Sequence, residues 1–272
     1  MEKVKSVKKK ITIVGGGHIG LALAMGLVRS GAVKGSQLTV SSRRLSKIQH
    51  LKKIGIAVTD DNASAVAHAD WVFLAVKPKL VGSVLAGLQG SIKKQLIISL
   101  AAGVTIKKLK SYAPNVGTFA RIMPNIPIAH MSGVVGLFAG TISKTNHAEL
   151  KEMLQVLGFV LQVKDERELE MLTVVSGSGP ATVSFFIDAL AHAGRELGLS
   201  QSTADALAKN TFKGTSAYMD VENVSAESLM NSVATKGGLT EAILGSLKES
   251  SVRRSIARAL KVGYVKIKKL RN

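Results

Sequence analysis

The chain has 272 residues, 46% of them hydrophobic, so it can bury a large core in one or two domains. Lys and Arg number 37 against 18 acidic residues, which gives a formal net charge of +19. This charge raises nucleic acid as a partner, but the aromatic content of 4% and the lack of a recognition module argue against it. A basic surface that attracts a phosphorylated cofactor or acidic metabolites fits the composition better.

The absence of cysteine excludes disulfides, thiol catalysis and cysteine-ligated metals. The six histidines are not paired at metal-ligand spacing, so no metal site is expected. Apolar runs are short and interrupted, well under the roughly 18 residues of a membrane span. The basic N-terminus leads into a strand-like segment without a secretory apolar core. We therefore expect a cytoplasmic protein that does not cross a membrane.

A glycine-rich loop follows the first predicted strand. Ile11–Val14 is typical of a buried parallel strand, and an apolar helix is predicted over Leu21–Val28. Between them lies Gly15-Gly16-Gly17-His18-Ile19-Gly20, a G-x-G-x-x-G motif in its proper context. The first glycine of such a motif allows the tight turn, the second lets the backbone approach a pyrophosphate, and the third lets helix and strand pack closely. The loop therefore predicts a dinucleotide site.

The end of the second predicted strand indicates which dinucleotide binds. Leu38-Thr39-Val40 is followed by Ser41-Ser42-Arg43-Arg44, whereas an NAD site usually has an acidic residue there. Two hydroxyls and two guanidiniums suit a 2′-phosphate, which Arg binds through paired charge-assisted hydrogen bonds. We predict NADP(H) as the cofactor, with NAD(H) as the alternative. The alternative is that these residues form an ordinary basic loop that binds no ligand.

Short apolar runs continue to alternate with helical patterns up to the domain boundary, which we place near Val163–Asp165. Lys77-Pro78 closes one strand and Ala101-Ala102-Gly103 follows the next, and ligands bind at such strand ends. Lys77 is predicted to face the cofactor, with a surface Lys before a turn Pro as the alternative. The other strands are predicted at residues 55–59, Ala69–Val76, Gln95–Leu100, from Phe119 onward, Val134–Phe138 and Phe159–Val163, with a helix over Thr145–Leu157.

Helical spacing dominates from Glu166 onward. The sequence thus predicts an α/β Rossmann-type N-terminal domain over residues 1–164, followed by an all-α C-terminal domain over residues 165–272. Long apolar helices with few aromatic residues favour packing against a second copy of the chain, with an isolated bundle as the alternative. The predicted helices are Glu166–Val175, Ala181–Leu197, Ser202–Met219, Ala226–Val233 and Thr240–Leu270.

Two glycine turns interrupt these helices. Ser176-Gly177-Ser178-Gly179-Pro180-Ala181 is interpreted as a helix start whose unpaired N–H groups can hold an anion. A hinge, or a plain N-cap with Pro near the first helical position, is the alternative. The second turn, Ala234–Glu241, is also rich in donors, and its alternative is a helix C-cap followed by an N-cap at Thr240. Two such turns in one helical domain favour a carboxylate-binding site.

In order and spacing, these segments resemble the pyrroline-5-carboxylate reductase family over essentially the whole chain. The resemblance implies a Rossmann domain with a C-terminal dimerisation domain, assembled as a homodimer or a larger homo-oligomer. It also implies NAD(P)H-dependent reduction of 1-pyrroline-5-carboxylate, a small imino acid, to L-proline. The motifs that carry it are the glycine loop, Leu74–Pro78, Ser99–Gly103, Met123–Pro127, Ser176–Ala181 and the Gly237-Gly238 turn.

The resemblance also implies which residues bind ligands. Because the imine nitrogen must be protonated, we predict that the Thr240 hydroxyl orients it by hydrogen bonding. Substrate contacts fall on Glu166, Ser176, Gly177, Thr235, Gly237 and Gly238, the last three from the partner subunit. Arg43 is included among the cofactor contacts because it follows the second strand, where a 2′-phosphate would bind. The predicted cofactor contacts are Gly15, Gly17, His18, Ile19, Gly20, Ser42, Arg43, Asn62, Ala75, Val76, Lys77, Pro78 and Ala101.

Some positions depart from the family pattern. Lys236 replaces the usual Pro, Leu239 replaces the first of two threonines, and Thr182 stands where Tyr is frequent. An acidic residue often found before the glycine turn has only Glu222 or Asn223 nearby. These departures leave open another small cyclic imine such as the six-membered piperideine carboxylate, a β-hydroxyacid, or a non-catalytic NADP-binding regulatory protein. The β-hydroxyacid is disfavoured because no Lys begins the helix that starts at residue 181.

Overall fold

The computed structural model describes residues 7–271, and its internal contacts divide the chain into two compact units. Unit 1 contains the described residues up to Pro180 and those from Gly263 onward, while unit 2 is Ala181–Val262. This division falls later than residue 164 because helix α6 (Glu166–Leu172) packs on the sheet of unit 1. Leu169 and Leu172 lie over Gly136, where a Cβ would come within 2.8 Å of Leu169.

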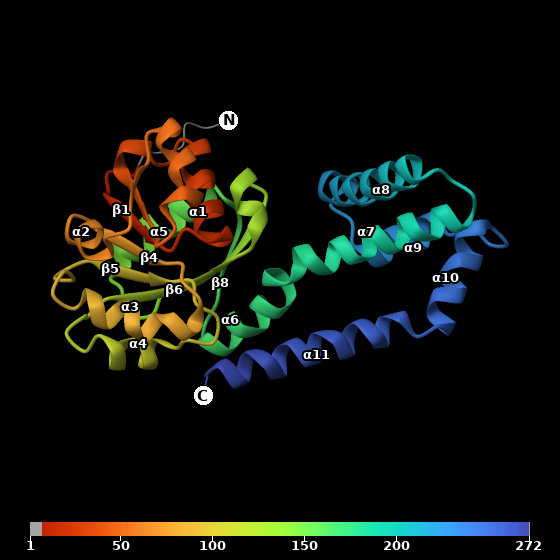
Figure 1. Cartoon of the computed structure of the whole chain (residues 1–272). Coiled ribbons are helices and arrows are strands. Elements are labelled where there is room, and N and C mark those ends of the chain that lie inside the picture. Colours follow the sequence, from red (N-terminus) through yellow and green to blue (C-terminus); the bar gives the residue numbers. More distant parts are fainter. Residues whose placement is uncertain (1–6, 272) are drawn as a thin grey trace. The chain divides into compact units, whose positions relative to one another are not determined.

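Unit 1 is built around one sheet (Figure 1). The strand order in this sheet is β3-β2-β1-β4-β5-β6-β7-β8. Strands β1 to β6 are parallel, β7 is antiparallel to β6, and β8 is parallel to β7. Each predicted strand is present, with its bounds shifted by a few residues at most. The strands are β1 Ile11–Val14, β2 Leu38–Ser41, β3 Ala57–Thr59, β4 Trp71–Leu74, β5 Leu96–Ser99, β6 Phe119–Pro124, β7 Gly133–Phe138 and β8 Gly158–Gln162.

Helices cover both faces of this sheet, so unit 1 has the three layers of a Rossmann-type domain (Figure 1). Successive strand residues point to opposite faces, so Phe73 enters one core and Leu74 the other. α1 (His18–Arg29) and α5 (Lys144–Gln155) pack on the first face; α2 (Asn62–Ala67), α3 (Val81–Leu88) and α4 (Ile106–Tyr112) pack on the second. Short 3₁₀ turns connect these elements at η1 Gly35–Gln37, η2 Leu45–Lys47, η3 Gln49–Ile54, η4 Pro78–Leu80 and η5 Ile126–His130.

Unit 2 is wholly helical among its described elements. The single helix predicted over Thr240–Leu270 is wrong, because it breaks at Ser250-Ser251, where Ser251 has a φ of 53°. Short hydroxyl side chains compete for backbone hydrogen bonds and so favour a turn over a helix interior. The helices are α7 Gly179–Glu196, α8 Gln201–Glu222, α9 Ala226–Val233, α10 Leu239–Glu249 and α11 Val252–Arg271, the end of α11 belonging to unit 1.

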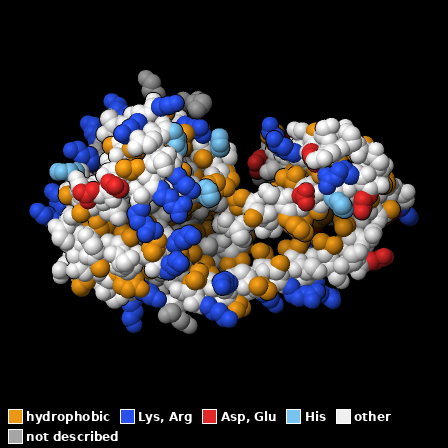
Figure 2. Space-filling view, in the orientation of Figure 1, with side chains coloured by type: hydrophobic (Ala, Val, Ile, Leu, Met, Phe, Trp, Pro, Cys, Tyr) orange, Lys and Arg blue, Asp and Glu red, His pale blue; other side chains and the backbone are white. Residues whose placement is uncertain are grey.

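The helices of unit 2 bury little of their apolar surface within the chain. Their buried cluster consists of Ala191, Ala204 and Ala208. Large side chains lie in solvent, including Phe185 at 67% and Leu197 at 88% exposure, and Figure 2 shows hydrophobic side chains along these helices. An apolar surface of this extent is typical of an interface rather than of a free face.

A continuous helix, Glu166–Glu196, joins α6 to α7 through a π-turn at Thr173–Gly177. The predicted helix start is confirmed at Gly179, where α7 begins, but not all of its amides are unpaired. The amide of Ser178 donates to the carbonyl of Thr173 at 3.2 Å, the i to i+5 bond of a π-turn. Because its two halves are joined, this helix of 31 residues is also long and apolar enough to span a membrane by length and composition alone, contrary to the expectation from shorter runs.

Candidate active site

The carboxyl ends of four neighbouring parallel strands, β2, β1, β4 and β5, meet at one edge of the sheet in unit 1. Backbone bonds join neighbours there: Gly15 N donates to Ser41 O at 2.9 Å, Ala75 N to Val14 O at 2.9 Å, and Leu100 N to Leu74 O at 3.0 Å. The predicted cofactor residues from the glycine loop, Ser42, the Ala75–Pro78 segment and Ala101 follow these strand ends. The parallel registers therefore bring together residues that are far apart in the sequence.

The glycine loop has the geometry that its motif predicts. Gly15 has a φ of 120°, and a Cβ on Gly20 would come within 2.0 Å of Gly15 O. A Cβ on Gly17, in contrast, would meet nothing within 4 Å. The first backbone bond after the loop runs from Leu21 N to Gly17 O, so the amides of the first turn of α1 stay available to a ligand. The first turn also has no acidic residue, which would repel a phosphate.

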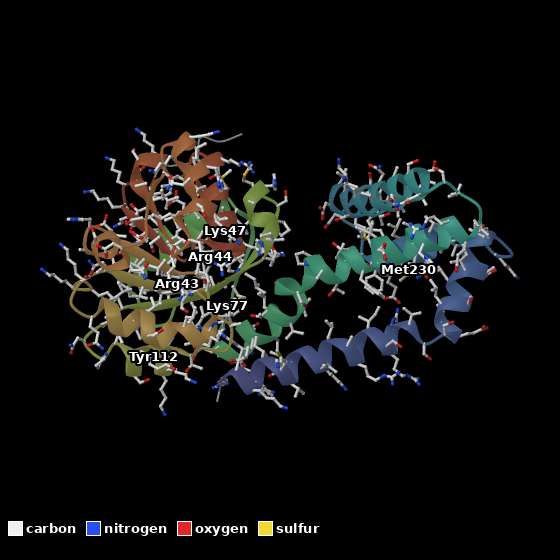
Figure 3. All side chains as sticks on the ribbon, viewed as in Figure 1. Arg43, Arg44, Lys47, Lys77, Tyr112 and Met230 are labelled. Carbon is white, nitrogen blue, oxygen red and sulfur yellow. The ribbon has the colours of Figure 1, made fainter. Side chains whose placement is uncertain are left out.

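Basic side chains lie beside this loop. Figure 3 shows Lys47, Arg44, Arg43 and Lys77 following one another along the near face of unit 1, and Figure 2 shows Lys and Arg gathered on that face. The four side chains are exposed, and none forms an ion pair within residues 7–271. Ser42 is fixed nearby, since its amide donates to Thr59 O at 2.9 Å. Sequence reasoning missed Lys47, although its place in the turn after the two arginines was a usable signal.

Two further predicted cofactor residues lie at the starts of helical turns on the same edge. Asn62 is the first residue of α2 and is half-buried, while the N-cap Asp61 accepts from Ser64 N at 3.0 Å. Lys77 precedes η4, and Pro78 is its first residue. Their contacts with a ligand stay a prediction.

A cavity of about 560 Å³ opens between the glycine loop, the ends of β5 and β6, the π-turn and the last part of α11. Three predicted residues line it: His18, Ile19 and Gly177. Ala101 is buried one residue before the lining residue Ala102. The lining is mostly apolar, which suits a flat ring with few fixed polar contacts. Its other residues are Leu100, Met123, Pro124, Asn125, Ile126, Thr173, Val174, Ser178, Gly263, Lys266, Ile267 and Leu270.

An ion pair between the buried Arg121 and the half-buried Glu166 lies next to the cavity. Arg121 on β6 is 0% exposed, and its Nη1 lies 2.7 Å from Glu166 Oε1, while Nη2 donates to Ala101 O at 3.4 Å. The same Glu166 oxygen accepts from Ile106 N at 2.8 Å. Glu166, predicted as a substrate contact, thus binds protein groups and is not among the residues that line the cavity. Sequence reasoning missed Arg121, although a charged residue inside the apolar run of residues 119–123 demands a partner.

The second glycine turn lies in unit 2 with Thr235, Gly237, Gly238 and Thr240. Gly237 has a φ of 74°, and its amide donates to Glu241 Oε2 at 2.7 Å. Gly238, not Thr240, is the N-cap of α10, because the helix already begins at Leu239. Thr240 is half-exposed, and its hydroxyl makes no hydrogen bond to another described residue. The predicted site residues are therefore divided between the two units.

Comparisons with known proteins give a family match for the N-terminal part of the chain and another for the C-terminal part. A family model described as pyrroline-5-carboxylate reductase dimerisation matches residues 166–270, and one described as NADP oxidoreductase, coenzyme F420-dependent, matches residues 10–103. The pyrroline-5-carboxylate reductase of Corynebacterium melassecola is 32% identical over 260 residues, 92% of this chain and 94% of the relative. That of Pseudomonas aeruginosa is 32% identical over 256 residues, 92% and 93% of the two chains.

Solved structures show the same likeness. A pyrroline-5-carboxylate reductase from Coxiella burnetii matches with a TM-score of 0.87 at 32% identity, over 98% of this chain and 100% of that one. The Plasmodium falciparum pyrroline carboxylate reductase with NADP bound shares the fold, with a TM-score of 0.88 at 24% identity over 98% and 100% of the two chains. The family suggested by the ordered motifs is thus confirmed, and the chain belongs to the pyrroline-5-carboxylate reductase family.

Proposed function

We propose that this protein reduces 1-pyrroline-5-carboxylate to L-proline with NADPH as the reductant. The observation that carries this proposal is the match of more than nine-tenths of the chain to named reductases. The glycine loop beside a mostly apolar cavity is consistent with it, because an apolar wall can hold a nicotinamide ring in place for hydride transfer.

The residues at the sheet edge fit a phosphorylated dinucleotide. The open space at Gly17 and the free amides of the first turn of α1 suit a pyrophosphate. Ser42, Arg43 and Arg44 offer hydroxyl and guanidinium donors for a 2′-phosphate, which favours NADPH over NADH. When bound, the reduced nicotinamide supplies a hydride. The chain itself contributes binding, orientation and exclusion of water.

The imino acid needs a second set of groups. We place its carboxylate at the Gly237-Gly238 turn, with the Thr240 hydroxyl directed at the imine nitrogen. A hydroxyl is a weak acid at neutral pH, so Thr240 orients the nitrogen and its proton rather than acting as the acid itself. The turn comes from the partner subunit in this proposal, because the apolar helices of unit 2 are exposed in a single chain. A homodimer or a larger homo-oligomer is therefore the working state.

The decisive assay incubates the purified protein with NADPH and 1-pyrroline-5-carboxylate, and follows the loss of NADPH absorbance together with L-proline formation. We expect NADPH to be consumed and L-proline to form at matching rates. Piperideine carboxylate serves as the competing substrate, because Leu239 replaces a threonine of the family pattern and is 79% exposed. A higher kcat/KM for the six-membered ring would assign the enzyme to that imine. NADPH binding without turnover of either imine would favour a regulatory protein.

Replacement of Thr240 tests the substrate side of the site. Thr240→Ala should lower kcat/KM for the imine about tenfold, the cost of one hydrogen bond made to the reacting nitrogen. Thr240→Ser keeps the hydroxyl and should keep most of the activity. Steady-state kinetics of the two variants decide the role: an Ala variant as active as the Ser variant would show that this hydroxyl does not orient the nitrogen.

A further inference from the structure

The continuous helix Glu166–Glu196 passes through Pro180 without ending there. Proline has no N–H, and in a helix its ring also crowds the carbonyl four residues earlier. That carbonyl belongs to Ser176. Here the Asn125 side chain supplies the missing donor, because its Nδ2 donates to Ser176 O at 3.1 Å. A residue at the end of β6 thus takes over a backbone bond of a helix that follows it in the chain.

The orientation of the Asn125 amide is fixed by its surroundings. The residue is buried, at 8% exposure, and its backbone N donates to Val134 O at 3.1 Å. Its Oδ1 accepts from Val134 N at 2.8 Å. Since Val134 N–H must meet an oxygen, the NH₂ group is left facing Ser176. The bond to the helix therefore rests on a rigid antiparallel contact with β7.

The π-turn that this bond supports forms part of the cavity wall. Thr173, Gly177 and Ser178 line the cavity together with Asn125. The hydroxyls of Thr173 and Ser178 are held by carbonyls of the same helix, since Thr173 Oγ1 donates to Leu169 O at 2.7 Å and Ser178 Oγ to Val174 O. One residue of an α-helix turns by about 100°, so loss of the extra residue of the π-turn would rotate this wall about the helix axis.

We propose that Asn125 is a positioning residue for the reduction: it supplies the hydrogen bond that Pro180 cannot, and so holds the wall of the cavity at residues 173–178. This proposal rests on the proposed function. It makes Asn125 and Pro180 a coupled pair, because the Asn125 amide is needed only where the backbone N–H at position 180 is missing.

A double-mutant cycle tests the coupling. Asn125→Asp keeps an acceptor for Val134 N but loses the amide donor, and Asn125→Ala is the uncharged second variant. Each should lower kcat with NADPH and 1-pyrroline-5-carboxylate about tenfold, the equivalent of one hydrogen bond. Pro180→Ala alone should stay near the wild type, because Asn125 still donates to Ser176 O. Adding Pro180→Ala to either Asn125 variant restores the backbone donor and should bring kcat to within about threefold of the wild type.

Melting temperatures and the KM for NADPH of the same proteins distinguish a positioning role of Asn125 from direct ligand contact and from a merely structural role. Rescue of kcat, with the KM for NADPH nearly constant throughout, supports the proposal. An active wild type whose Asn125 variants stay slow when combined with Pro180→Ala would overturn it, since Asn125 would then act by touching a ligand. Coupling in melting temperature without rescue of kcat would overturn it too, because the bond would then be merely structural. An inactive wild type instead contradicts the proposed function, and with it the assignment of Asn125 to that reaction.

Discussion

Arg121 is a fully buried cation whose charge is balanced, within the described residues, by Glu166 at 2.7 Å. The pair joins the end of β6 to α6 and to the backbone of Ala101, next to the cavity. A buried charge that loses its partner cannot recover its hydration, so such a pair is costly to break. The negative charge of Glu166 is therefore needed to neutralise Arg121, whether or not Glu166 also contacts a substrate.

We expect Glu166→Gln to lower the free energy of unfolding by about 3 kcal/mol, because it keeps the oxygen for Ile106 N but leaves Arg121 uncompensated. Urea unfolding measures the change. Glu168→Gln is the matched control: its carboxylate accepts from the exposed Lys164 N, and the loss should stay within about 0.5 kcal/mol. A normal unfolding free energy for Glu166→Gln, with a raised KM for the imine, would instead support the predicted substrate contact.

The two arginines after β2, Arg43 and Arg44, are predicted to select NADPH over NADH by binding the 2′-phosphate. Arg43→Ala with Arg44→Ala should raise the KM for NADPH at least about tenfold, the loss expected for a charge-assisted contact to the 2′-phosphate, and leave the KM for NADH nearly unchanged. Steady-state kinetics with both nucleotides give the ratio. Lys34→Ala, another exposed cation of unit 1, is the control. Equal changes for both nucleotides would show that the 2′-phosphate is not bound here.

Among the elements, the glycine loop contains one glycine needed for packing, Gly20, and one proposed only for ligand binding, Gly17. Gly17→Ala adds a Cβ into open space, so the melting temperature should stay near the wild type while NADPH binding is lost. Gly20→Ala places a Cβ 2.0 Å from Gly15 O, so both melting temperature and binding should fall. Thermal unfolding and NADPH titration of the two variants make the comparison. Unchanged NADPH affinity in Gly17→Ala would remove the pyrophosphate from this loop.

At the start of α10, the Glu241 carboxylate already binds the Gly237 amide, which is one of the donors proposed for the substrate carboxylate. Glu241 Oε2 accepts from Gly237 N at 2.7 Å, so an incoming carboxylate meets a like charge there. Glu241→Gln keeps an acceptor for the turn but removes the charge, and we expect a several-fold lower KM for the imine with little change in kcat. Initial rates over a range of imine concentrations measure it. A raised KM would mean that Glu241 assists the substrate rather than competing with it.

At the scale of the whole molecule, unit 2 has a buried cluster of three alanines and many exposed large apolar residues. The match of residues 166–270 to a dimerisation family model is consistent with the proposal that a second copy of the chain covers that surface. Cytoplasmic localisation, and the absence of nucleic-acid and membrane partners, stay predictions.

We expect the wild type to sediment as a dimer or larger, and Phe185→Glu on α7 to shift it toward the monomer with loss of activity. Phe185 is 67% exposed in the single chain, so burying a charge in its place at an interface would be costly. Gln201→Glu, an exposed position at the start of α8, adds the same charge as a control. Sedimentation velocity distinguishes the states, and a monomeric wild type would contradict the interface.

The sequence by itself determined the features that local pattern controls. The strands, the glycine loop, most helix bounds and the family follow from hydrophobic periodicity and from motifs a few residues long. Only the tertiary structure decided the features that depend on distant partners. Asn125 meets Ser176 across 51 residues and Arg121 meets Glu166 across 45, so neither pair has a local pattern. The Ser176–Gly179 stretch resembles a helix start in the sequence because Gly and Pro usually break helices. Only the structure shows that a π-turn at Thr173–Gly177 precedes this start and that Asn125 from another element bonds to Ser176 O.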